Sequence, residues 1–205
     1  MEEVLREAPN IISNAEKRNT KKDYSEDDIV EKLNSEEKEE ILFGLDLLKR
    51  RDVLSFLPEV SAILTKCPYQ SIRSLALMLL VQKEVDRELL FLSSEGTITV
   101  NPKKCLLPFT GKTFNEVTYR MGEEYKDVSL SEAGLQILSQ YVIYTYPHEI
   151  KEEDIPYLVA GIYYLVNNLY YKNEMSIVEL AKEKELDEDK LNKTIKKLDN
   201  IQKEI

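Results

Sequence analysis

Tryptophan is absent from this chain of 205 residues, histidine occurs once, and cysteine occurs twice. Cys67 and Cys105 fit neither the spacing of a metal site nor a disulfide framework. Together with the lack of a signal-peptide pattern, they indicate a reducing cytoplasm. Because His148 is the only histidine, a zinc site built from several histidines is excluded.

Glycine is also scarce, with six scattered residues. None belongs to a Gly-rich element followed by Lys-Ser or Lys-Thr, so no phosphate-binding loop is predicted. Long apolar runs are missing too. The most apolar stretch, residues 155–171, contains Pro156 and the pair Asn167-Asn168, and it falls short of the roughly 20 residues that a membrane span needs. We expect a buried helix there and no membrane segment.

The charge is strongly one-sided, at -10, while 42% of the residues are hydrophobic and 32% are charged. These fractions are typical of a soluble protein with a real core. The negative charge opposes nonspecific binding of the whole molecule to nucleic acid or to an anionic membrane. A basic face on one part of the surface remains compatible with this negative net charge.

Consecutive amphipathic helices are the main pattern present, over residues 41–81. Apolar residues recur at helical spacing in three series, which begin at Ile41, Val53 and Ile72. Pro58 interrupts the second series, so that helix is kinked or begins near Ser55. Short connections between such helices make them antiparallel neighbours. Asn34 with Glu37, and Ser129 with Glu132, resemble capping boxes at two helix starts.

The period then changes. Residues 97–100 alternate polar and apolar side chains after a run rich in Leu and Phe, and Gly96 can supply the positive φ of a tight turn. We expect a β-hairpin over about 86–101. Helical patterns resume at 113–124, from 129 to Pro147, after Pro156, and at 176–184 and 187–203.

These patterns predict a mainly α fold, either a helical bundle or a short α-α solenoid, with one small β-hairpin. Residues 1–34 form a polar segment compatible with a short helix or with mobile chain. Residues 35–171 form the helical domain with the hairpin inserted. Residues 172–205 form a C-terminal helical pair packed on it.

The stretch from Tyr69 to Pro102 resembles a known family. It combines a helix with Arg73 near its start, the segment Val85-Asp86, and a hairpin ending in Asn101-Pro102. This is similar to the C-terminal part of an uncharacterised family of cytoplasmic helical-repeat (TPR-type) proteins of low-GC Gram-positive bacteria and mycoplasmas. The ending Tyr144-Thr145-Tyr146-Pro147 is also similar, and the likeness covers roughly Ser35 to Tyr171. It implies a fold and a compartment rather than an activity.

No catalytic constellation stands out. His148 lies in a turn beside Glu149, a poor place for the shielded histidine of a Ser/His/Asp site. The carboxylates lie in solvent-like runs, whereas acid–base catalysis needs them in an apolar pocket. We therefore predict no catalytic residues, no metal and no cofactor. An unfamiliar enzyme site would require a deep polar pocket holding Tyr119, Arg120 or His148.

Tyrosine is concentrated in one region, because eight of the twelve fall between Tyr141 and Tyr171. Adjacent residues on a helix point about 100° apart, so both members of a pair cannot be buried on one face. Tyrosine is enriched at protein interfaces. The candidate partner-binding residues are Tyr163, Tyr164, Tyr170 and Tyr171; the alternative is boundary tyrosines with buried rings and solvated hydroxyls.

Residues 175–198 are compatible with a helix-turn-helix. Its second helix would present basic candidates for nucleic-acid contact: Lys190, Lys193, Lys196 and Lys197. However, the turn has Lys184-Glu185 where glycine is usual, and Asp187, Glu188 and Asp189 stand where bases and phosphates would approach. A structural pair of helices is the interpretation we favour.

We therefore expect a noncatalytic cytoplasmic module that binds another protein or self-associates. The alternative is a DNA-binding regulator that uses the segment 175–198, although nucleic acid is the less favoured partner.

Overall fold

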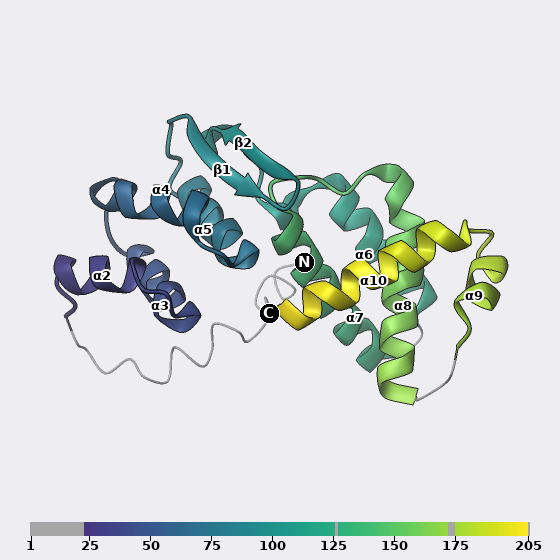
Figure 1. Ribbon diagram of the computed structural model, residues 1–205. Coiled ribbons are helices and arrows are strands. Elements are labelled where there is room, and N and C mark those ends of the chain that lie inside the picture. The colour runs from purple at the N-terminus through teal and green to yellow at the C-terminus, as the bar shows by residue number, and fades with distance from the viewer. Residues whose placement is uncertain (1–22, 126, 172–174, 205) are drawn as a thin grey trace.

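The computed structural model describes residues 23–125, 127–171 and 175–204. Within them the chain forms helices and one two-stranded antiparallel sheet (Figure 1). The elements in chain order are α2 (Glu26–Leu33), α3 (Lys38–Leu48), α4 (Leu57–Lys66), α5 (Gln70–Gln82), β1 (Leu89–Ser93), β2 (Gly96–Val100), α6 (Lys112–Glu124), α7 (Val128–Thr145), α8 (Ile155–Tyr171), α9 (Ile177–Glu183) and α10 (Glu188–Glu204). The prediction of a mainly α fold with one small hairpin is confirmed.

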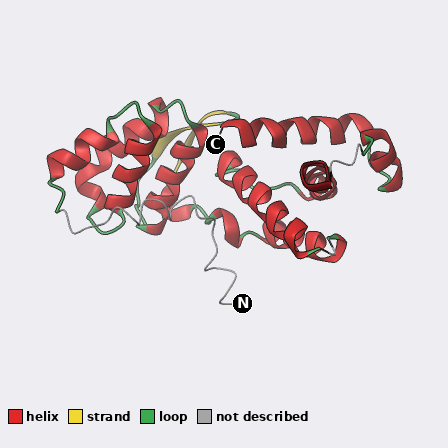
Figure 2. Cartoon of the chain, turned by 90° about the horizontal axis from the view of Figure 1, so that it is seen from below, coloured by secondary structure: helices red, strands yellow, loops and turns green. Residues whose placement is uncertain are grey.

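The elements from α2 to β2 enclose one cluster of buried side chains. Ile29, Ile41, Val60 and Ile72 come from four successive helices and meet in this cluster. β1 packs against α4 and α5, which buries Phe91 completely. The sheet needs this support, because an isolated hairpin is marginal in water. In Figure 2 one end of the hairpin extends from this group of helices toward α10 and the C-terminus.

Pro58 lies at the start of the expected second helix, so it does not kink that helix. Residues Val53–Phe56 form a 3₁₀ helix, and α4 begins at Leu57 with Pro58 in its first turn. Proline is tolerated there because the N–H that it lacks would have no partner within the helix.

Both expected capping boxes are wrong. Asn34 ends α2, and α3 starts after Glu37. α7 is capped by Asp127, whose carboxylate accepts a hydrogen bond from the backbone N–H of Ser129 at 2.8 Å. A capping box is instead present at α2, where Ser25 and Asp28 exchange hydrogen bonds between side chain and backbone. The same short motif recurs along polar segments, so the motif alone does not locate a helix start.

The hairpin has a two-residue loop, Ser94-Glu95, between the paired residues Ser93 and Gly96. Gly96 has φ +126°, a conformation that side chains rarely adopt. The expected use of glycine at this turn is confirmed.

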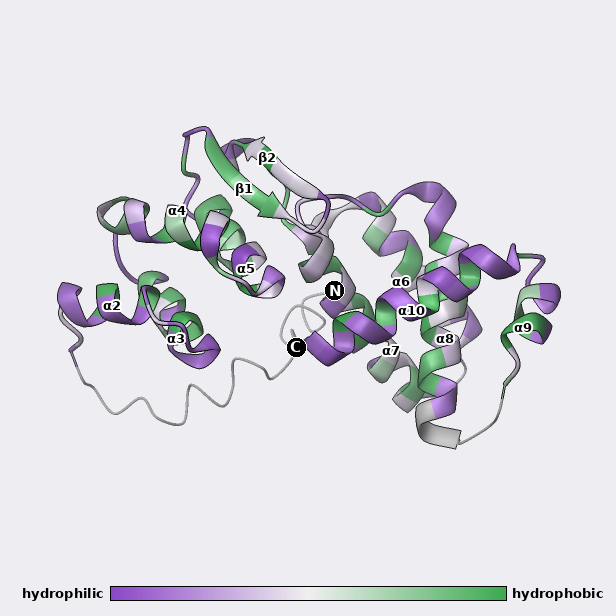
Figure 3. Ribbon diagram, in the orientation of Figure 1, coloured by the Kyte–Doolittle hydropathy of each residue, from purple (hydrophilic) through white to green (hydrophobic). Residues whose placement is uncertain are grey.

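The elements from α6 to α10 enclose further buried side chains, and Figure 3 shows that these helices carry both hydrophobic and hydrophilic residues. Val117, Leu138, Ile162 and Leu198 join α6, α7, α8 and α10 in one cluster. A smaller cluster joins side chains of α9 to α8 and α10. α5 packs against α7, and Tyr146 is buried among side chains of the first cluster. Among the described residues, no helix combines the length and apolarity required to cross a bilayer.

Candidate functional site

A groove of about 450 Å³ lies where the hairpin tip, α7 and α10 meet. We call it the α10 groove. The hairpin contributes its two loop residues, α7 contributes one tyrosine near its end, and α10 contributes one face over three turns. The lining residues are Ser94, Glu95, Tyr144, Lys193, Lys196, Lys197, Asn200, Ile201 and Glu204.

Helical spacing explains why three lysines share this groove. Lys196 and Lys197 follow Lys193 by three and four residues, so each of them is a neighbour of Lys193 on the surface of the helix. The face that packs on α8 carries Leu191, Ile195 and Leu198, all buried. A Cβ added to Gly161 on α8 would lie 3.2 Å from Leu198 Cδ1, so glycine lets the two helices approach closely. The lysines are thereby directed away from α8.

The lysines of α10 differ in whether they have acidic partners. Lys190 pairs with Asp154 at 2.8 Å, and Lys203 pairs with Asp199. Among the described residues, the three groove lysines form no ion pair. Lys197 Nζ lies 5.1 Å from the centroid of the Tyr141 ring, a cation–π contact. The positive charge of the groove is therefore not neutralised by neighbouring carboxylates in contact with it.

The groove also contains two carboxylates. Glu204 accepts a hydrogen bond from the backbone N–H of Gln70 at 3.3 Å, at the start of α5. Burial raises the pKa of Tyr144, and the nearby Glu204 raises it further. Tyr144 is therefore neutral at physiological pH, and its hydroxyl donates to the Glu204 carboxylate. Glu95 lies at the exposed hairpin tip.

The hairpin tip is fixed by Ser93, which is only 4% exposed. Its Oγ donates to Gly96 O at 2.8 Å and accepts from Glu95 N at 3.1 Å. His148 Nε2 lies 3.2 Å from the same Oγ. Since the hydroxyl hydrogen is directed to Gly96 O, the imidazole acts as a donor here and not as a base toward Ser93. The contact fixes the hairpin to the turn after α7.

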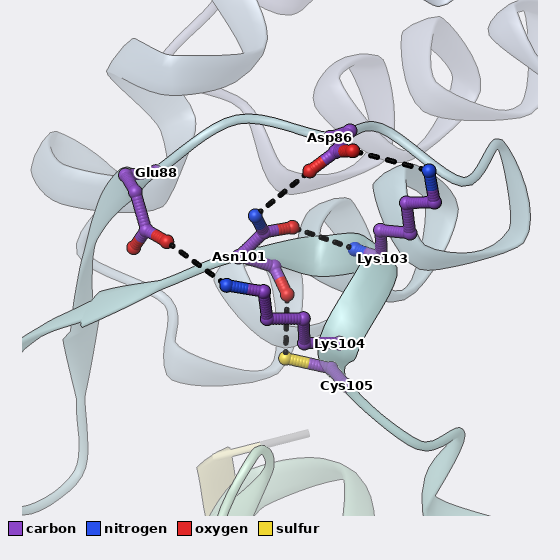
Figure 4. A network of polar contacts seen from close by, with 6 residues as sticks. All are labelled: Asp86, Glu88, Asn101, Lys103, Lys104 and Cys105. Carbon is purple, nitrogen blue, oxygen red and sulfur yellow. Dashed lines mark hydrogen bonds and ion pairs between the residues drawn. The ribbon is translucent and has the colours of Figure 1, made fainter.

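Other polar contacts near the hairpin have a structural role. Figure 4 shows the network at its open end. Asp86 accepts from Asn101 Nδ2 at 3.0 Å and pairs with Lys103 at 3.1 Å. The hydrogen bond from Asn101, and then the hydrogen bond and the charge of Lys103, lower the pKa of Asp86. Lys104 pairs with Glu88 across the hairpin base, so the network joins the segments before β1 and after β2.

A second concave surface, of about 470 Å³, lies between the end of α3 and the end of α5. Two of its three cations, Lys83 and Arg51, already bind backbone oxygens, and the third, Arg87, is exposed. Lys83 Nζ donates to Lys49 O at 2.8 Å, and Arg51 donates to Tyr24 O at 3.0 Å. Cations that bind carbonyls at a helix C-terminus stabilise that helix end. We assign this surface a structural role.

The tyrosines singled out from the sequence lie elsewhere. Tyr163 and Tyr164 are half-buried and pack against the cluster around α9. The Tyr163 ring also contacts the Tyr125 ring, with centroids 5.5 Å apart. The side chains of Tyr170 and Tyr171 lie outside the described part of the structure. The groove instead contains Tyr144, which belongs to the same tyrosine-rich region but was not among the candidates.

The structure places three of the four basic candidates in the groove and the fourth in an ion pair outside it. Lys193, Lys196 and Lys197 line the groove, whereas Lys190 Nζ pairs with Asp154 and lies 4.3 Å from the centroid of the Tyr157 ring. In the turn between α9 and α10, Glu185 has φ +54°, the conformation that glycine usually supplies.

The structure also describes the three residues that we named for an unfamiliar enzyme site. Tyr119 is 65% exposed, Arg120 pairs with Glu116 on the same helix, and His148 contacts Ser93. None of them lines either described concave surface. In the parts of the chain that the structure describes, no three ligating side chains converge to hold a metal ion.

Comparison with known proteins finds no family model, no curated protein and no solved structure that matches this chain. The resemblance to the helical-repeat family stays a prediction.

Proposed function

We propose that this chain is a noncatalytic module that binds another protein, and that the α10 groove is its binding site. The observation that carries the proposal is the combination, on one concave surface, of three lysines without ion pairs among the described residues and the side chain of Tyr144. Tyrosine combines a large apolar ring with a polar tip and is over-represented at protein interfaces. The lysines would determine the orientation and the rate of association.

Several features favour a protein over duplex DNA as the partner. A recognition helix enters the major groove with its N-terminal residues near the bases. The first turn of α10 carries Glu188 and Asp189, which would repel phosphates. The remaining basic candidate near that end, Lys190, has an intramolecular partner in Asp154.

We also propose that the protein resides in the cytoplasm. Cys67 and Cys105 are both free thiols, and Cys67 is buried. Free cysteines are usual in reducing compartments.

Site-specific photo-crosslinking in cells that express the protein tests the binding site. A crosslinking residue at Asn200 lies in the groove, and the matched control is Asn115, an exposed position on α6. We expect a protein adduct from position 200, lost on Tyr144→Ala, and none from position 115. Equal yields from both positions, or an adduct that nuclease removes, would refute the proposal.

A further inference from the structure

We infer that the occupant of the α10 groove is an acidic segment of the partner protein, bound in an extended conformation. The inference depends on the proposed function and adds the chemistry of the partner. It follows from the charge of the groove and from the spacing of its side chains along α10.

The charge of the groove contrasts with the charge of the chain. The chain as a whole carries -10, yet the middle of α10 presents three lysines without an ion pair among the described residues. The flanking lysines of the same helix, Lys190 and Lys203, are each neutralised by an aspartate. Within α10, the lysines that face the groove are therefore the ones left available to an external carboxylate among the described residues.

The two groove carboxylates do not cancel this charge by contact. Glu204 accepts the hydrogen bond from Gln70 N, and its own backbone oxygen accepts a hydrogen bond from Lys38 Nζ at 3.0 Å. Glu95 stands on the hairpin loop and forms no ion pair with a described residue. Glu95 therefore reduces the attraction for an acidic ligand without blocking it, which makes it a useful site for a gain-of-affinity variant.

The spacing of the groove side chains selects an extended segment. Lys193 and Lys197 are both exposed and lie four residues apart, a rise of about 6 Å along α10. Alternate residues of an extended chain are separated by about 6.6 Å. A segment with acidic residues at its first and third positions would place them opposite these two lysines. An apolar residue at its fifth position would contact Tyr144, since Ile201 is buried in the floor of the groove.

The experiment uses the full chain and defined probes in fluorescence anisotropy titrations. The main probe is a labelled peptide with glutamate at its first and third positions, leucine at its fifth, and serine between them. The comparison probes are the same peptide with lysine in place of glutamate, a labelled DNA duplex, and inorganic phosphate as a competitor. We expect the acidic peptide to bind, the basic peptide not to bind, and the affinity to fall with salt because exposed charges are screened.

Charge-reversal variants locate the binding. The triple change Lys193→Glu, Lys196→Glu and Lys197→Glu should weaken binding of the acidic peptide tenfold or more, on the order expected for several exposed ion pairs. The matched control is Lys66→Glu, Lys151→Glu and Lys182→Glu, three exposed positions outside the groove that give the same net charge. This control should bind within about twofold of the unaltered chain, since distant exposed charges are screened.

A second pair of variants tests the inference even if the triple variant folds poorly. One variant of the pair should raise the affinity for the acidic peptide, and the other is its control. Glu95→Lys should strengthen peptide binding severalfold, whereas Glu123→Lys, an exposed change on α6, should not. Equal effects of the groove and control variants would overturn the inference. Full competition by inorganic phosphate would also overturn it, because a free-anion site would then account for the charge.

The two proposals fail in different ways. If position 200 crosslinks a protein but the acidic peptide does not bind, the acidic occupant is wrong and the protein-binding function stands. If the DNA duplex binds more tightly than the peptide and competes with it, nucleic acid replaces the protein partner and both proposals fail.

Discussion

The carboxylate of Glu204, in the last turn of α10, accepts a hydrogen bond from the backbone N–H of Gln70 at 3.3 Å, across 134 positions of sequence. Gln70 begins α5, and no side chain of the preceding residue, Tyr69, caps this helix. A helix start carries unsatisfied N–H groups and a partial positive charge. Glu204 therefore caps α5 from the other end of the chain and joins α10 to the first group of helices.

Glu204→Ala should lower the free energy of unfolding by about 1 kcal/mol, the usual worth of one such hydrogen bond or cap. Glu204→Gln keeps an acceptor oxygen and should lose less. Urea denaturation measures both, and Glu183→Ala, at an exposed position on α9, is the control. Hydrogen exchange at the Gln70 amide should accelerate in Glu204→Ala. An unchanged exchange rate at Gln70 would show that the cap does not form in solution.

The helices and the hairpin could be predicted from the sequence because each has a local period of apolar residues. The starts of α3 and α7 could not, since Asn34 and Ser129 have the residue types of caps without the backbone position. Where a helix begins depends on how the chain enters it, and that is determined by packing rather than by a four-residue motif.

The α10 groove could be predicted only in part. Spacing along one helix placed Lys193, Lys196 and Lys197 together, and this local relation is present in the structure. The other wall comes from Glu95 and Tyr144, which are distant in sequence from α10. The ion pair of Lys190 with Asp154 likewise depends on the packing of α10 on α8. No local pattern encodes such a contact.

Two glycines in helices should respond to alanine with opposite signs. A Cβ at Gly134 would lie 2.6 Å from Met121 Cε and 2.9 Å from Tyr125 Cε2. Tyr125 cannot move freely, because its hydroxyl donates to Val159 O at 2.8 Å. Gly134→Ala should destabilise the protein by about 1–3 kcal/mol through overpacking.

Gly122 is the matched position, because a Cβ there would meet no atom within 4 Å. Gly122→Ala should stabilise the protein by up to about 1 kcal/mol, since alanine favours the helix. Thermal denaturation followed by circular dichroism measures both variants. The packing of α7 against α6 would be incorrect if Gly134→Ala raised the melting temperature as well.

Arg73 is a buried cation that joins α5 to β1. Only 7% of it is exposed, and its guanidinium donates to Leu92 O at 2.7 Å, to Gln70 Oε1 at 2.5 Å and to Cys67 O. Burial lowers its pKa, but an arginine remains charged at any physiological pH.

Arg73→Met should lower the free energy of unfolding by about 3 kcal/mol or more, because it takes the donor from two buried acceptors and one part-buried acceptor. Arg73→Lys restores the charge without the planar fork and should recover only part of the loss. Urea denaturation provides the measurement, with the exposed Arg87→Met as the control. A loss no larger than that of the control would mean that these hydrogen bonds do not hold the hairpin to α5.

Tyr141 lies under Lys197 beside the groove, and burial raises its pKa to about 12, with further contributions from the charges of Asp154 and Glu95. In the unfolded chain the pKa of a tyrosine is about 10. Below about pH 10 both states keep the proton, so Tyr141 adds no pH dependence. Between about pH 10 and 12 the unfolded state loses its proton first, and stability falls by up to about 1.4 kcal/mol per pH unit.

Tyr141→Phe removes the pH-dependent loss of stability that Tyr141 causes. As the pH increases above about 10, the free energy of unfolding of this variant should therefore rise relative to that of the unaltered chain. Tyr119→Phe, at a position 65% exposed, should follow the unaltered chain throughout. Denaturation midpoints at a series of alkaline pH values provide the measurement. Parallel curves for all three proteins would show that Tyr141 titrates equally in both states, and that its ring is therefore not buried beneath α10.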